Sequence, residues 1–117
     1  MKLAIVGLGY VGITTAAAFS KLGHTIIGYE NNIKKLATLT SGELPITEPE
    51  VGDILIENRE RIYYREKIES NINEADLVFV SVGTPTSEAG ETDLTALNGV
   101  MEELSRFGEI DLPIVIR

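Results

Sequence analysis

The sequence contains no cysteine and only one histidine, His24, among its 117 residues. Without cysteine the chain has no disulfide, no thiolate metal ligand and no cysteine nucleophile, and one histidine adds too little to hold zinc, so we expect no metal site. Such a composition is typical of a cytoplasmic protein. An excess of basic residues is also lacking, because the formal net charge is −8. This charge argues against a nucleic-acid partner, whose phosphates attract a basic surface.

Long uninterrupted hydrophobic runs are lacking as well. Residues 3–19 are uncharged and follow Lys2, as in the core of a secretory signal peptide. Gly7, Gly9 and Gly12 interrupt this run, and glycine weakens an inserted helix. We therefore expect no signal peptide and no membrane segment, and we interpret the run as a strand, a turn and a helix.

Apolar runs with the length of strands alternate with helix-like segments along the chain. This alternation predicts an α/β fold with a doubly wound parallel sheet and right-handed crossovers. The expected strands are 3–6, 24–29, 62–64, 77–82 and 113–116, and the expected helices are 13–22, 31–40, 51–61, 68–74 and 94–107. Residues 1–117 suffice for a single domain. Because the last expected strand reaches the end of the sequence, we expect a truncated domain from a longer protein, with an open sheet edge.

A glycine-rich turn follows the first expected strand. Gly7, Gly9 and Gly12 fit the pattern G-x-G-x-x-G, which is typical of a Rossmann-type dinucleotide-binding domain when it lies between a strand and a helix. Gly7 permits the tight turn, Gly9 lets a pyrophosphate approach the backbone, and Gly12 lets the helix pack closely. Free amides around Tyr10 and Val11 then donate to the phosphate oxygens. The alternative is a glycine turn that serves packing alone.

An acidic residue, Glu30, comes directly after the second expected strand. Its distance from the glycine turn suits the carboxylate that accepts hydrogen bonds from the adenosine ribose. A carboxylate at this point repels a 2′-phosphate, so the sequence predicts that NAD is preferred to NADP. The alternative is a solvated charge at the start of a helix.

Three blocks of the sequence carry more specific information than the glycine turn. They are MKLAIVGLGYVG, SGELPITEP and SVGTPTSEAGETDL. In this order they resemble the UDP-glucose/GDP-mannose dehydrogenase family, and the resemblance covers essentially the whole chain. It implies the NAD-binding domain of an enzyme that oxidises the C6 alcohol of a nucleotide sugar to a carboxylate with two NAD molecules. It also implies a homo-oligomer when the protein is full length.

The resemblance extends to individual cofactor-binding residues. Glu30 matches the ribose-binding acid, which is more often aspartate in the family, and Lys35 matches a basic residue along the adenosine. The turn after the strand 77–82 lies where open α/β sheets bind ligands. The resemblance implies that this turn lies beside the cofactor, with Thr84 nearest the nicotinamide half. For this turn, a loop start without a ligand is the alternative. The expected set is Gly7, Gly9, Tyr10, Val11, Gly12, Glu30, Lys35, Val82, Gly83, Thr84 and Pro85.

The chain also departs from the family. Thr47 stands where an aromatic residue is usual, and Glu50 stands where glycine is usual. The family's catalytic residues are absent, and the double oxidation needs a thiohemiacetal on a cysteine that this chain lacks. We therefore expect the chain alone to bind NAD and to catalyse nothing. Two alternatives are the NAD-binding domain of another NAD-dependent dehydrogenase, such as one for hydroxy acids, and a free-standing NAD-sensing module.

Overall fold

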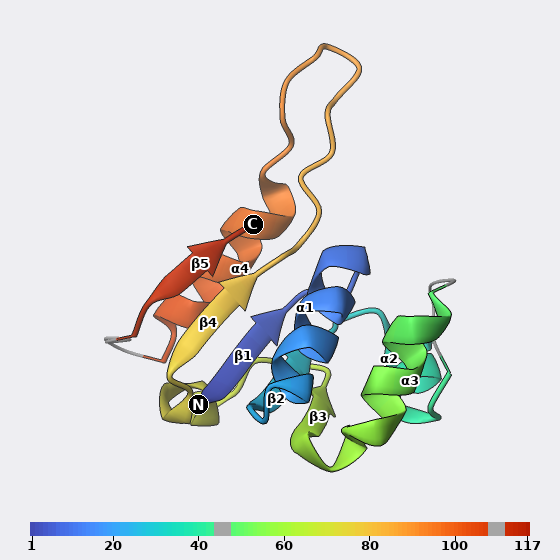
Figure 1. Ribbon diagram of the computed structural model, residues 1–117. Coiled ribbons are helices and arrows are strands. Elements are labelled where there is room, and N and C mark those ends of the chain that lie inside the picture. The colour runs from blue at the N-terminus through green and yellow to red at the C-terminus, as the bar shows by residue number, and fades with distance from the viewer. Residues whose placement is uncertain (44–47, 108–111) are drawn as a thin grey trace.

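The computed structural model describes residues 1–43, 48–107 and 112–117, and these form a parallel β-sheet with helices on both faces (Figure 1). The strands are β1 (Lys2–Val6), β2 (Thr25–Tyr29), β3 (Ile62–Arg65), β4 (Leu77–Val80) and β5 (Ile114–Ile116). The α-helices are α1 (Tyr10–Lys21), α2 (Ile33–Thr40), α3 (Pro49–Glu57) and α4 (Thr95–Ser105), and 3₁₀ turns cover Arg59–Arg61 and Ser70–Glu74.

The strand order in the sheet is β3-β2-β1-β4-β5, and every pairing is parallel. The chain therefore starts in the middle, builds outward to β3, and crosses back to continue on the other side of β1. This confirms the predicted doubly wound sheet. The order reverses between β1 and β4, and open α/β sheets bind ligands outside the carboxyl ends of the strands at such a reversal.

Two buried clusters hold the helices on the sheet. On one face, Leu3 and Ile5 pack with residues of α1, α2 and α3. On the other face, Ala4 and Val6 pack with α4 and with the 3₁₀ turn Ser70–Glu74. Alternate residues of β1 thus face opposite clusters, and both faces exclude water. This two-sided burial explains why the strand appears in the sequence as a continuous apolar run.

Several predicted boundaries were wrong. The helix expected over 13–22 begins at Tyr10, because Gly9 is its N-cap and the last glycine of the pattern lies inside the helix. The helix expected over 51–61 is α3 followed by a separate 3₁₀ turn, and it starts at Pro49, a residue that is favoured in the first turn. The strand expected over 77–82 ends at Val80.

The other predicted elements agree with the structure to within two residues at each end. Gly23 ends α1 with a φ of +95°, a backbone conformation that glycine adopts readily. Asn32 caps α2, since its side chain accepts a hydrogen bond from the Lys35 amide at 3.1 Å. The departure at Thr47 lies outside the described residues.

A hairpin arm between β4 and α4 projects away from the carboxyl edge of the sheet (Figure 1). Thr86 and Thr92 pair across it in an antiparallel bridge, and the Ser87 amide donates to the Glu91 carbonyl at 2.7 Å. The helices of residues 1–43, 48–107 and 112–117 are all too short or too polar to span a bilayer.

Candidate cofactor-binding site

The glycine turn is held by close backbone contacts. Gly7 has a φ of +93°, and a Cβ there would lie 2.9 Å from the Ser81 carbonyl oxygen. A Cβ on Gly12 would collide with the Gly7 carbonyl oxygen, so α1 packs on the turn through a bare α-carbon. These contacts confirm the two packing roles that the pattern predicted. Gly7 also donates its amide to the Tyr29 carbonyl at 2.9 Å, which joins the turn to β2.

Gly9 differs from the other two glycines, because its missing side chain faces open space. Apart from its two neighbours in the chain, no described residue has an atom within 4 Å of a Cβ built on Gly9. Its φ of −76° and ψ of −162° are accessible to any L-residue, so the backbone here does not require glycine. Among the residues that the structure describes, no side chain caps α1 at this end, and the first turn itself contains no acidic residue. The amides of that turn have no intrahelical acceptor, which leaves a concave, electropositive backbone surface beside Gly9.

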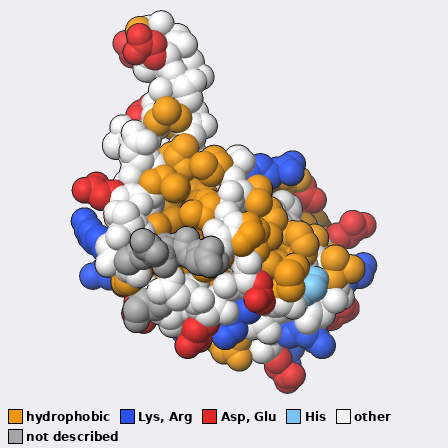
Figure 2. Space-filling view, turned by 90° about the vertical axis from the view of Figure 1, so that its left-hand side faces the viewer, with side chains coloured by type: hydrophobic (Ala, Val, Ile, Leu, Met, Phe, Trp, Pro, Cys, Tyr) orange, Lys and Arg blue, Asp and Glu red, His pale blue; other side chains and the backbone are white. Residues whose placement is uncertain are grey.

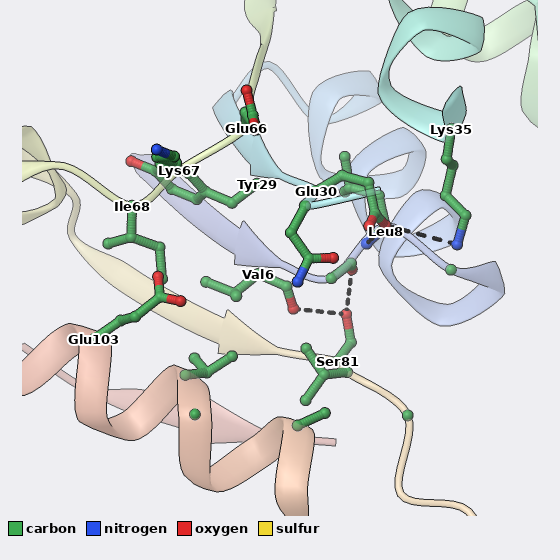
Figure 3. Close-up of a pocket in the computed structure, with 18 of the residues that line it drawn as sticks. Val6, Leu8, Tyr29, Glu30, Lys35, Glu66, Lys67, Ile68, Ser81 and Glu103 are labelled. Atoms are coloured by element: carbon green, nitrogen blue, oxygen red, sulfur yellow. Dashed lines mark hydrogen bonds and ion pairs between the residues drawn. The ribbon is translucent and has the colours of Figure 1, made fainter. Parts of the chain in front are cut away.

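Glu30 lies at the carboxyl end of β2 and is 7% exposed, which excludes the interpretation as a solvated charge. One carboxylate oxygen accepts from the Leu8 amide at 3.2 Å, within the glycine turn. The other accepts from the Asn32 amide at 3.0 Å. The ammonium of Lys35 lies 3.6 Å from the first oxygen, and a dashed line marks this ion pair in Figure 3. The carboxylate is therefore fixed next to the glycine turn and retains lone pairs for further donors.

A cavity of about 850 Å³ opens at this edge of the sheet. It brings together six of the residues expected from the sequence, which are Gly7, Gly9, Glu30, Lys35, Val82 and Gly83. Tyr10, Val11 and Gly12 lie at the first turn of α1 and do not line the cavity. Thr84 and Pro85 are exposed at the base of the hairpin arm and do not line it either. The structure thus assembles the adenosine half of the expected site more completely than the nicotinamide half.

Other residues of this cavity were missed at the level of sequence. Ser81 follows β4 and its hydroxyl donates to the Gly7 carbonyl at 2.7 Å, so it fixes the turn from the neighbouring strand (Figure 3). Its position at the carboxyl end of a buried strand was the one available signal. One part of the cavity, which we call its wing, is lined by Tyr29 and Ile68 on one side and by Val100 and Glu103 of α4 on the other. Only the tertiary fold places these segments together.

Tyr29 is the most enclosed polar residue of this wing. Its side chain extends from β2 toward the connection that carries Lys67 and Ile68 (Figure 3). The hydroxyl is buried and has no hydrogen-bond partner among the described residues. Burial raises the pKa of the Tyr29 hydroxyl, with a further contribution from the negative charge of Glu69. The phenol is therefore neutral, and it contributes an apolar ring to the wing.

These features fit an extended dinucleotide. The open space over Gly9 and the uncapped start of α1 suit a pyrophosphate. The buried carboxylate of Glu30 suits the hydroxyls of a ribose. The part of the cavity beside Ile68 and Val100 combines apolar side chains with charged ones at Lys67 and Glu103.

A comparison with known families gives the same result for the whole chain. The model of the NAD binding domain of the UDP-glucose/GDP-mannose dehydrogenase family matches residues 1–117. The chain belongs to this family. NAD is accordingly the cofactor of the domain, and the hydroxy-acid dehydrogenase alternative is set aside.

Members of the family from Pseudomonas aeruginosa illustrate the similarity. The chain is 36% identical to a UDP-glucose 6-dehydrogenase over 106 residues, which are 89% of this chain and 23% of that protein. It is 32% identical to a GDP-mannose 6-dehydrogenase over 106 residues, or 89% of this chain and 24% of that protein. The crystal structure of a ternary complex of GDP-mannose dehydrogenase superposes with a TM-score of 0.92 at 30% identity, covering 100% of this chain and 28% of that one. The chain thus spans about a quarter of the length of these relatives.

Proposed function

We propose that this chain binds NAD with the pyrophosphate over Gly9 and the first turn of α1. The observation that supports this best is the open space at Gly9, because the backbone there tolerates a side chain and no neighbouring atom fills its place. A phosphate in this space accepts hydrogen bonds from the free amides of the helix start. Tyr10, Val11 and Gly12 contribute backbone amides and no side-chain group, so they can take part without lining the cavity.

The two halves of the cofactor then extend in opposite directions. The adenosine ribose donates to Glu30, beside Lys35, and the adenine base enters the wing between Ile68 and Val100. The nicotinamide half runs toward the turn after β4, past Val82 and Gly83 to Thr84 and Pro85. This orientation follows from the position of Glu30 on the β2 side of the glycine turn and of Val82 on the β4 side.

We infer that the domain, residues 1–117, serves as the N-terminal part of a nucleotide-sugar 6-dehydrogenase of the UDP-glucose or GDP-mannose type. The parent protein would oxidise the C6 alcohol to a carboxylate with two NAD molecules, as a homo-oligomer in the cytoplasm. The names of the relatives support this reaction class. The chain is about equally similar to a UDP-glucose 6-dehydrogenase and to a GDP-mannose 6-dehydrogenase, so either nucleotide sugar is a candidate substrate.

Calorimetric titration of the 117-residue chain with NAD tests the binding, and NADH absorbance in the presence of UDP-glucose or GDP-mannose tests the activity. We expect one NAD per chain and no sustained NADH production, because the cysteine chemistry of the double oxidation is missing from these residues. A folded chain that gives no heat of binding would refute the cofactor assignment. NADH production proportional to the concentration of purified chain would refute the proposed inactivity.

A further inference from the structure

The ion pair between Lys35 and Glu30 lies at the ribose end of the cavity. The Lys35 ammonium is 3.6 Å from a carboxylate oxygen, and the two side chains are 33% and 8% exposed. Both residues line the cavity. The first turn of α2 places Lys35, since its own amide donates to the Asn32 cap. A lysine held in this way presents its charge to whatever occupies the ribose position.

The remaining partners of Glu30 are neutral. Its carboxylate accepts from the backbone amides of Leu8 and Asn32, which orient it without cancelling its charge. Among the described residues, Lys35 is the one side chain within ion-pair distance of it. Lys67 and Arg106 also line the cavity, and neither forms an ion pair with Glu30 in the described part of the chain. The charge at the ribose position is therefore set by one buried anion and one half-exposed cation.

We propose that Lys35 determines how strongly the site discriminates NAD from NADP. Its ammonium is able to pair with a 2′-phosphate, but in this protein it is already paired with the carboxylate of Glu30. This inference rests on the proposed NAD binding. A 2′-phosphate at this point meets two opposite charges, repulsion from Glu30 and attraction to Lys35. With Glu30 ionised, the repulsion dominates because its carboxylate is the more buried charge and is less screened by water. Without the charge of Glu30, Lys35 is free to pair with the phosphate.

A double-mutant cycle on the full 117-residue chain tests the proposal, with dissociation constants for NAD and NADP measured for each variant at low ionic strength. In Glu30→Gln, we expect the NADP-to-NAD affinity ratio to rise about tenfold, which corresponds to about 1.4 kcal/mol. In Glu30→Gln with Lys35→Met, that rise should disappear. In Lys35→Met alone, the ratio should fall below that of the wild type, because the phosphate then faces Glu30 without a counter-ion.

Lys34→Met is the matched control, because Lys34 precedes Lys35 in α2, is exposed and does not line the cavity. It should leave the ratio unchanged. The effect of Lys35 should also weaken as salt is raised, because the lysine is partly exposed. An equal ratio in Glu30→Gln with and without Lys35 would overturn the proposal. If Glu30→Gln does not fold, an unchanged ratio in Lys35→Met overturns it instead. Failure of the wild type to bind NAD would refute the proposed function, which is a separate outcome.

Discussion

Replacement of Gly9 by valine separates the cofactor role of the glycine turn from its structural role. The side chain enters a region where, apart from the two chain neighbours, no described residue has an atom within 4 Å of its Cβ. The backbone there is in an extended conformation that valine adopts readily. Losing the glycine restricts the unfolded chain, which stabilises the protein by roughly 0.4–1 kcal/mol. A valine N-cap is less favourable than glycine by a similar amount, on the order of 0.5–1 kcal/mol. The free energy of unfolding should thus change by less than about 1 kcal/mol.

The effect on binding should be far larger. The branched side chain occupies the position that we assign to the pyrophosphate, and it prevents the phosphates from reaching the first-turn amides of α1. A hydrogen bond to a charged group contributes about 1.5–3 kcal/mol, so the loss of two of them costs about 3–6 kcal/mol. This corresponds to a loss of NAD affinity of roughly a hundredfold to ten-thousandfold.

Calorimetry and thermal unfolding of the same samples measure both quantities. Gly12→Ala is the control with the opposite behaviour, because its Cβ would collide with the Gly7 carbonyl oxygen and approach the Ser81 hydroxyl to 2.9 Å. Overpacking of this kind costs about 1–3 kcal/mol, so the control should unfold several degrees lower. A folded Gly9→Val protein that binds NAD with the affinity of the wild type would show that the pyrophosphate does not lie there.

Three further predictions concern other parts of the molecule. Glu30→Ala should narrow the preference for NAD over NADP in calorimetric titrations, and it should lower the free energy of unfolding by about 1–3 kcal/mol, because the Leu8 and Asn32 amides lose their acceptor; an unchanged affinity ratio would show that Glu30 does not contact the ribose. At the β5 edge, Figure 2 shows hydrophobic side chains gathered, and Val115 is 38% exposed. Val115→Lys should therefore reduce self-association of the 117-residue chain, measured by light scattering. If the original chain and the variant are equally monomeric at high concentration, the prediction is contradicted. Hydrogen bonds from the Thr95 hydroxyl and amide lower the pKa of Asp93 from 3.8. The ionised carboxylate therefore stabilises the folded protein at pH values above 3.8, and this stabilisation is lost as the pH falls through the pKa that Asp93 has in the folded protein. In an NMR titration, Thr95→Val should move the Asp93 pKa back toward 3.8, and no movement would mean that the hydroxyl does not hold the charge.

The local pattern of the sequence was enough for the fold class and for the core of the cofactor turn. Leu3 to Val6 is a continuous apolar run, as a strand buried on both faces requires. Such a run can be recognised from the residue types alone. The three glycines and Glu30 are recognisable because they stand at a fixed spacing after two apolar strands, whether the backbone requires the glycine, as at Gly7 and Gly12, or does not, as at Gly9. For the same reason, the assignment to the family could be made from three short blocks.

Element boundaries depended on contacts that no local pattern reports. The start of α1 at Tyr10 follows from the packing of Gly12 against Gly7, which brings the last glycine inside the helix. β4 ends at Val80, and beyond it the Ser81 amide donates to the Val6 carbonyl and the Ser81 hydroxyl to the Gly7 carbonyl, which ties the chain to the neighbouring strand and turn. Such contacts join positions more than seventy residues apart in the sequence.

The burial of Glu30, its ion pair with Lys35 and the wing of the cavity were decided by tertiary structure. The sequence left open whether Glu30 is a solvated charge, because exposure depends on which strands become neighbours. Parallel pairing of β1, β2 and β4 brings Leu8, Glu30 and Ser81 to one edge of the sheet, and the crossover to β4 places Ile68 opposite α4. Composition and spacing thus determined which residues we expect to bind the dinucleotide, while the order of the strands determined which of them share one cavity, since only the fold converts distance along the chain into distance in space.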